Sequence, residues 1–151
     1  MWQSMALVEK SVLIENSAQQ MFDLVDRVED YPKFLPWCSQ SQLEYRDEKK
    51  IIATLHINYL NVKSHFTTEN EKKIPLWMSI RLIDGPFRRL EGMWRFKPLA
   101  EHACKIEFQL SYEFSSKMLE KLIGPVFSQI ANTLVEAFVK RAAQVYGVQN
   151  V

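Results

Sequence analysis

Apolar and polar residues alternate one by one along most of the chain between Gln42 and Phe114, and this pattern constrains the fold more than any other feature. Cys104–Phe114 shows it most clearly, because Cys, Ile, Phe, Leu, Tyr and Phe are separated by Lys, Glu, Gln, Ser and Glu. Successive side chains of a strand point to opposite faces of a sheet. The pattern therefore predicts an antiparallel sheet with one buried and one solvent-exposed face.

Short breaks divide this region into strands, and each break is short enough for a hairpin connection. A further segment rich in β-formers, Leu7–Ile14, precedes the first helix signal, so we expect about seven strands in all. The breaks are Asp47-Glu48, Leu60-Asn61, Asn70–Pro75, Asp84–Pro86 and Pro98–His102.

Two short helical segments are expected after the first strand. Ser17 and Gln20 have the spacing of a capping box, and the apolar stripe that follows indicates a helix. The segment Tyr31–Cys38 contains two prolines four residues apart, which predicts a second short helix or a tight loop rich in aromatic residues. The stripe consists of Ala18, Met21, Phe22, Val25 and Val28.

The C-terminal segment Met118–Tyr146 has a helical pattern that is interrupted at Gly124-Pro125. Proline is favoured at the first position of a helix, so we expect a short helix and then a long one from about Pro125, with Gly147 just past its end. The apolar stripe expected to face the sheet is Ile123, Phe127, Ile130, Leu134, Phe138 and Val145.

These elements predict an α+β domain with a helix-grip architecture. One long helix must cover the buried face of the sheet, so the sheet has to curve around it. A helix about 10 Å across does not fill such a hollow, and we expect an apolar cavity beside it. The length of 151 residues suits a single domain, which we place at residues 5–147. Residues 1–4 are then an N-terminal extension, with Met5 as an alternative start, and 148–151 a C-terminal tail.

Composition excludes several function classes. The net charge of +1 argues against a strong overall field for nucleic acid, and 4 glycines leave no room for a Gly-rich phosphate loop. Cys38 and Cys104 form no CxxC motif, which predicts reduced and packed thiols. There is no signal-peptide pattern, and Leu122–Val139 is too polar for a membrane span. We expect a cytoplasmic protein whose membrane contact, if any, is peripheral at the inner face.

Three separated segments resemble the signatures of the Coq10/RatA family of START-like proteins. The similarity extends over roughly residues 5–147, with the segments in the family's order and spacing. They are Tyr31–Cys38, Asp84–Phe96 with Pro98-Leu99, and Ala137-Phe138 with Arg141-Ala142 and Tyr146-Gly147. The resemblance implies the same helix-grip fold. It also implies one of two activities: ubiquinone binding that supports respiration, or a ribosome-directed toxin that blocks the association of ribosomal subunits.

We therefore expect non-catalytic binding of a polyprenyl quinone, with ubiquinone as the ligand and no other cofactor. The alternative is the toxin of a toxin–antitoxin pair, with the large ribosomal subunit as partner. His56 and His65 fall on polar strand faces and His102 in a turn, so neither a metal site nor catalysis is expected. For the quinone class, partners are isoprenoid lipids and a membrane surface.

The expected ligand-binding residues face the hollow of the sheet or close it. The aromatic segment at Tyr31, Phe34, Leu35 and Trp37 either plugs one sheet edge or forms a lid at the cavity mouth that touches a bilayer. The others are either core packing or the lining of an isoprenoid channel. They are Tyr59, Phe66, Leu82, Trp94, Phe108, Tyr112, Phe127, Ile130, Leu134 and Phe138.

Arg141 is expected to have a buried guanidinium. On a helical wheel it lies about 20° from Leu134, within the apolar stripe. A buried guanidinium needs partners, so two interpretations follow. Arg141 either forms a structural ion pair or donates to a quinone carbonyl, beside Tyr59 or Tyr112.

Basic residues offer two further contact surfaces. Phe87, Arg88 and Arg89 follow a Gly-Pro turn, and Phe87 either folds back onto the sheet or contacts a membrane or partner among anionic groups. Arg95 and Lys97 align on one strand face, which gives the ribosome alternative a modest basic strip. The opposing interpretation is a mixed, solvated surface.

Overall fold

Seven strands and three helical segments follow one another along residues 5–147, the part of the chain that the computed structural model describes. They are β1 (Ala6–Ile14), α1 (Ala18–Asp26), the 3-10 helix η1 (Val28–Lys33), β2 (Cys38–Arg46), β3 (Lys50–Tyr59), β4 (Val62–Lys73), β5 (Trp77–Asp84), β6 (Phe87–Ala100), β7 (Ala103–Phe114) and α2 (Lys117–Tyr146). The extension and tail expected at residues 1–4 and 148–151 lie outside the described residues.

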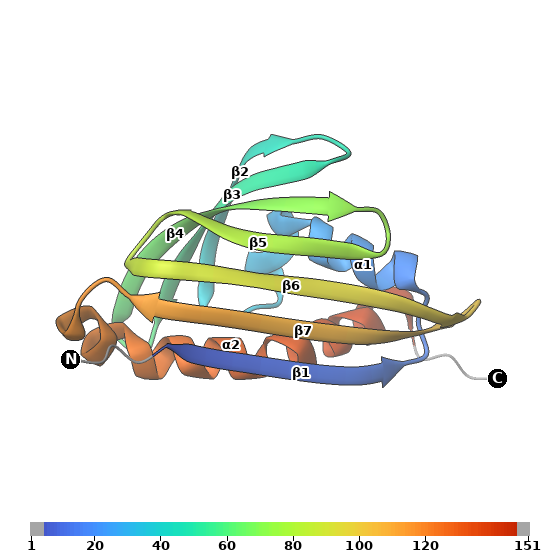
Figure 1. Cartoon of the computed structure of the whole chain (residues 1–151). Helices are drawn as coiled ribbons and strands as arrows, with labels where there is room; N and C mark the ends of the chain where they lie inside the picture. Colours follow the sequence, from blue (N-terminus) through green and yellow to red (C-terminus); the bar gives the residue numbers. More distant parts are fainter. Residues whose placement is uncertain (1–4, 148–151) are drawn as a thin grey trace.

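The strands form one antiparallel sheet in the order β1-β7-β6-β5-β4-β3-β2. The first strand pairs with the last, from Ala6 opposite Tyr112 to Ile14 opposite Cys104. The sheet bends around α2, which runs alongside β1 and β7, while α1 lies near the C-terminal end of α2 (Figure 1). This arrangement confirms the predicted helix-grip α+β fold.

The start of α1 is fixed by the predicted capping box. The Gln20 N–H donates to Ser17 Oγ at 3.0 Å, and the Ser17 N–H donates to Gln20 Oε1 at 3.1 Å. These bonds satisfy two backbone donors that would otherwise be unpaired at the helix end. After α1, the segment with two prolines begins as the short helix η1, which ends at Lys33.

Two predicted breaks are shorter in the structure. β4 continues through Asn70 as far as Lys73, although a turn was expected from Asn70. The chain stays extended here because it pairs with both neighbouring strands: Asn70 lies opposite Ile51 of β3, and Lys72 lies opposite Met78 of β5. At the other site, β6 continues to Ala100 with an irregularity after Pro98, where a turn was expected.

The expected interruption of the C-terminal helix is wrong, because α2 is one helix of 30 residues with Pro125 inside it. The residue before a proline is disfavoured in a helical backbone conformation, partly because its Cβ clashes with the proline ring. Gly124 has no Cβ, so this part of the clash does not arise. Both flanks also pack on the sheet, since Ile123 and Phe127 are buried. Burial on both sides of Pro125 offsets the one backbone hydrogen bond that proline cannot make.

The core lies between the concave face of the sheet and α2. Most of the predicted stripe of α2 is buried there, including Ile130 and Phe138. Leu134 is half-buried, and Val145 is 48% exposed because it lies in the last turn of the helix, beside an outer groove. The expectation that Leu122–Val139 is too polar for a membrane span is wrong by length and composition alone, because α2 is apolar enough to cross one. The core helix of a globular domain passes the same test.

Candidate functional site

An apolar cavity of about 80 Å³ lies between the sheet and α2. Strands β3 to β7, the segment after α1 and the middle of α2 contribute to its walls. The lining is Tyr31, Trp37, Leu55, Phe66, Thr68, Asn70, Ile80, Leu90, Trp94, Phe108, Leu110, Phe127, Ile130, Ala131, Leu134 and Phe138. Its volume corresponds to only a few water molecules, each of which takes about 30 Å³ in the liquid.

The structure brings together nine of the residues that were expected to bind a ligand. These are Tyr31, Trp37, Phe66, Trp94, Phe108, Phe127, Ile130, Leu134 and Phe138. Leu35, Tyr59 and Leu82 pack against or within the core without lining the cavity. Tyr112 belongs to a neighbouring aromatic cluster, where its ring lies 4.8 Å from that of Phe127.

Aromatic rings make the cavity narrow. The Trp94 ring lies 4.5 Å from that of Phe108 and 5.3 Å from that of Phe138. On the other side, Phe66 and Phe127 meet edge to face at 6.0 Å. Rings at these distances are in contact, so a bulky ligand can enter only if some of them move.

Sequence analysis missed the two polar side chains of the lining, Thr68 and Asn70, which both lie on β4. The Asn70 Oδ1 atom is buried without a hydrogen-bond partner, and its Nδ2 donates only to the Met78 sulfur, at 3.6 Å. The signal was present in the alternation, because Phe66, Thr68, Asn70 and Lys72 share one face of the strand. The sequence alone predicts a turn from Asn70.

Two rings of the segment expected to be a plug or a lid, Tyr31 and Phe34, meet the ring of Phe138 on α2. Tyr31 contacts both Phe34 and Phe138, at centroid distances of 6.0 and 5.4 Å. The Tyr31 hydroxyl donates to the Val25 carbonyl at 2.6 Å, which fixes the ring to the end of α1. Burial raises the pKa of Tyr31 well above its ordinary value, so this hydroxyl remains a donor. Tyr31 and Phe138 line the cavity, whereas Phe34 does not.

Phe34 instead lines a groove on the outer surface, between α1, η1 and the end of α2. The groove measures about 620 Å³ and is lined by Asp23, Leu24, Asp26, Arg27, Asp30, Phe34, Arg141, Val145 and Tyr146. Its wall combines three carboxylates with two guanidinium groups, so it is polar where the inner cavity is apolar.

Both interpretations of Arg141 required a buried guanidinium, and the structure contradicts that premise. Arg141 is half-exposed in the outer groove, where its guanidinium lies 5.1 Å from the centre of the Phe34 ring. It donates to Gln144 Oε1 at 3.4 Å. The stripe rotates away from the sheet towards the end of α2, which the helical wheel alone does not show.

Phe87 is not available for membrane or partner contact. Its side chain is 5% exposed and stacks on Phe114 at 4.9 Å, so the ring folds back into the core. Arg88 and Arg89 are exposed, but each lies near a carboxylate. Arg88 is 3.5 Å from Glu113, and Arg89 is 2.9 Å from Glu91.

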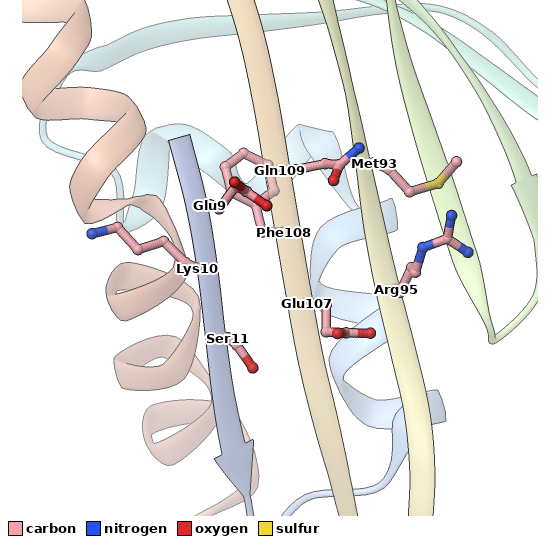
Figure 2. A pocket seen from close by; sticks show the side chains of 8 residues that line it. All are labelled: Glu9, Lys10, Ser11, Met93, Arg95, Glu107, Phe108 and Gln109. Atoms are coloured by element: carbon pink, nitrogen blue, oxygen red, sulfur yellow. The ribbon is translucent and has the colours of Figure 1, made fainter. Parts of the chain in front are cut away.

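The expected basic strip is likewise balanced by acidic residues on the outer face of the sheet. A hollow of about 240 Å³ lies on that face. Figure 2 shows its lining side chains on β1, β6 and β7. Arg95 lies opposite Glu107 in the ladder, and Lys97 binds Glu107 at 2.9 Å. The Lys97 hydrogen bond lowers the pKa of Glu107. This outcome matches the alternative of a mixed, solvated surface.

A network of charges connects α1 and η1 to the sheet. Lys72 Nζ lies 2.7 Å from Asp26 Oδ1, and the Lys72 side chain is 2% exposed. Arg46 binds Glu29 through both guanidinium ends, at 2.7 Å each, and also donates to the Asp26 carbonyl. The Arg46 hydrogen bond is the main reason why the pKa of Glu29 falls to about 2. The network holds the helical segments over the end of the cavity.

The histidines and cysteines of the described residues lie outside the cavity lining. His56 and His65 stack on the outer face at 5.5 Å, and His102 is exposed. Cys38 and Cys104 are free and buried, and burial raises the pKa of each thiol to about 11. Within residues 5–147 no three His, Cys, Asp or Glu side chains gather as metal ligands.

A curved sheet that closes around one long helix and leaves an apolar cavity between them defines a START-like domain. The chain belongs to the family of polyketide cyclases, dehydrases and lipid transport proteins, whose pattern matches residues 14–139. Sequence relatives then confirm the resemblance to the Coq10/RatA group.

Three of those relatives carry two kinds of name. The chain is 43% identical to the ribosome association toxin RatA of Vibrio cholerae, over 95% of this chain and 99% of that protein. It is 37% identical to RatA of Escherichia coli, over 96% and 92%. It is 32% identical to the mitochondrial coenzyme Q-binding protein COQ10 homolog B of Xenopus laevis, over 94% of this chain and 60% of that protein.

Solved structures agree with the fold. The Zhui aromatase/cyclase of a Streptomyces species superimposes with a TM-score of 0.77 over 98% of this chain and 100% of that one, at 15% identity. An 18 kDa protein of Caulobacter crescentus superimposes with a TM-score of 0.71 over 95% and 99%, at 25% identity. The first likeness concerns the fold alone.

Proposed function

We propose that this protein binds a polyprenyl quinone, with ubiquinone as the ligand, between its sheet and α2, and releases it chemically unchanged. The observation that carries the proposal is a mostly apolar cavity whose wall contains one buried polar atom without a hydrogen-bond partner, Asn70 Oδ1. Apolar walls suit an isoprenoid tail, and a few polar groups suffice to orient a head group. The name of the Xenopus relative is the support for the identity of the ligand.

The cavity lining favours binding over catalysis. Its described residues include neither carboxylates, histidines nor amines, so the walls offer no group suited to general acid–base work at neutral pH. The Tyr31 hydroxyl is bound to a backbone carbonyl and is held in its protonated form. Polar groups at the lining can therefore orient a ligand but are poorly suited to transform it.

The size of the cavity adds a requirement. A volume of about 80 Å³ is below the range of about 300–1,000 Å³ that is usual for small-molecule sites. A quinone must therefore displace side chains when it binds. The lid is suited to such movement because Phe34 is only half-buried and borders the outer groove. Access would be from the cytoplasm or from the inner face of a membrane.

Organic extraction of the purified protein, followed by mass spectrometry, tests this proposal. We expect a co-purifying or exchangeable ubiquinone. Leu134→Trp fills the cavity and should abolish its binding, whereas Leu122→Trp, on an exposed position of the same helix, should not. A wild-type protein that neither contains nor takes up quinone under conditions in which it is folded would overturn the proposal.

A second candidate is association with the large ribosomal subunit, and the observation that favours it is the name shared by the relatives that are 37–43% identical. Binding to ribosomal phosphates weakens steeply with salt, whereas burial of an isoprenoid does not. Co-sedimentation with large subunits from low to physiological salt measures it. Changing Arg88, Arg89, Arg95 and Lys97 to Glu tests the basic strip, and unchanged co-sedimentation would exclude those four residues as the contact.

A further inference from the structure

We infer that Asn70 is the anchor for the oxygen-bearing head group of the ligand, and that its amide binds the oxidised quinone and the reduced quinol alike. This inference rests on the proposed function and adds to it the residue that recognises the head group. It follows from an unpaired polar atom, Asn70 Oδ1, in a wall that is mostly apolar.

Asn70 occupies an unusual position for an asparagine. Its side chain lines the cavity, its Oδ1 atom is buried, and this oxygen accepts no hydrogen bond. Its Nδ2 contacts only the Met78 sulfur, and a thioether is a weak acceptor. Buried polar groups are normally paired, because they lose their hydrogen bonds to water when the protein folds. An amide left unpaired in this way is available to a molecule that enters the cavity.

The neighbours on β4 indicate which way the ligand lies. Thr68, two residues before Asn70, is the other polar side chain of the lining, and Phe66 comes two residues earlier still. On the opposite side, Lys72 is already committed to Asp26. The head group therefore lies at Asn70 and Thr68, and the tail extends towards Phe66 and Phe127, whose rings are in contact.

The chemistry of an amide explains why one residue can serve both redox states. Its NH₂ group donates and its carbonyl oxygen accepts, and the two ends exchange places when the amide rotates by half a turn. A quinone carbonyl accepts from Nδ2, and a quinol hydroxyl donates to Oδ1. Because the present partner of Nδ2 is only a thioether, this rotation breaks no strong bond.

Two substitutions separate these roles, and a third is the control. Asn70→Leu removes both polar ends of the side chain, and Asn70→Asp supplies an acceptor without a donor. The control, Asn58→Leu, makes the same asparagine-to-leucine change at an exposed position on the outer face of β3. The probes are a short-tailed ubiquinone, its quinol kept reduced without oxygen, and an isoprenoid hydrocarbon that lacks oxygen.

We expect Asn70→Leu to weaken the binding of quinone and quinol by about tenfold each, as the loss of one hydrogen bond does, and to leave hydrocarbon binding unchanged. Asn70→Asp should weaken quinone binding more than quinol binding. Asn58→Leu should match the wild type. Thermal unfolding provides a second readout, because Asn70→Leu removes an unpaired buried oxygen and should not lower the melting temperature.

The two proposals fail in different ways. If the wild type binds none of the three probes, the proposed function is wrong. If the wild type binds quinone and folded Asn70→Leu binds it equally well, the cavity is a quinone site but Asn70 is not its anchor. Equal losses for the hydrocarbon and the quinone would also contradict the anchor, because they would indicate a general change of the cavity.

Discussion

The rings of Phe34 and Phe138 meet edge to face, with centroids 5.2 Å apart, and they face different spaces. Phe34 borders the outer groove, and Phe138 lines the inner cavity. Tyr31 contacts both rings and is tied to α1 by its hydroxyl. This pair of rings therefore forms a partition between the outer groove and the apolar cavity.

Removing the outer ring should accelerate ligand exchange. In Phe34→Ala the partition loses its solvent side while the cavity wall at Phe138 remains, so we expect association and dissociation of an apolar fluorescent probe to become about tenfold faster, with little change in affinity. Stopped-flow fluorescence measures both rates. Arg141→Gln is the control, since it removes only the cation above the ring. Unchanged rates in Phe34→Ala would show that ligands enter elsewhere.

We expect the bend of the sheet to require a glycine at position 92, where a larger residue would destabilise the fold. A Cβ at this position would lie 2.5 Å from the Gln109 carbonyl oxygen and 2.9 Å from Leu110 Cδ1. The first atom belongs to the backbone of β7 and cannot rotate away, so Gly92→Ala should destabilise the protein by about 1–3 kcal/mol. Urea unfolding provides the measurement, and Ser111→Ala on the outer face of β7 is the control. A variant as stable as the wild type would show that β6 and β7 separate easily here.

Stability should decrease in acid because of Glu29. Folding lowers the pKa of this carboxyl from 4.5 to about 2, chiefly through the Arg46 hydrogen bond. Between these pH values the unfolded chain binds more protons than the folded one, so the free energy of unfolding falls as the pH falls. Urea unfolding from neutral pH to about pH 2 should show a smaller loss in Arg46→Gln than in the wild type.

The size of this effect is limited, because the Glu29 side chain is 43% exposed and solvent screens the pair. Arg81→Gln is the matched control, since it breaks a 2.7 Å ion pair with Glu69 on the sheet away from α1. If both variants lose the same amount of stability at every pH, Glu29 does not cause the acid dependence.

Removing one partner of the Lys72–Asp26 pair should destabilise the fold strongly, whereas replacing both partners with apolar residues should destabilise it little. Lys72→Met leaves Asp26 with Arg46 as its remaining cation, 3.9 Å away, and we expect a loss of about 3 kcal/mol. Lys72→Met combined with Asp26→Leu should recover most of this loss, because no partly buried charge is then left without a partner. Thermal unfolding of the single and double variants decides the matter. If the double variant is as unstable as the single one, the ion pair itself stabilises the folded state, and the loss in the single variant is not due only to the unpaired charge.

The sequence predicted the fold well because its signals were local and repeated. The alternation through Cys104–Phe114 and the capping box at Ser17 each depend on neighbours in the chain, and both are confirmed. The predicted interruption at Pro125 failed because packing on the sheet outweighed a local preference. Helix propensity contributes little per residue compared with the burial of a side chain such as Phe127.

The candidate site was harder to predict because it depends on distant contacts. Asn70 resembles a turn residue in the sequence, but pairing with β3 and β5 carries β4 past it. Arg141 lies at a position that a helical wheel assigns to the core, but its side chain lines the outer groove beside α1 and η1. The cavity volume is the small space left after many large side chains have packed. Residue types alone therefore predicted which side chains line the cavity, but not how narrow it is.

The pairing of β1 with β7 has a consequence for how the chain acquires its structure during synthesis. β1 is made first, yet its register partners run from Tyr112 back to Cys104. Until that distant segment has been translated, β1 has no strand to pair with and its apolar residues remain uncovered. Closure of so long a loop is slow. The nascent chain therefore cannot protect β1 until the last strand of the sheet has been made, and in this interval β1 is exposed to aggregation and proteolysis.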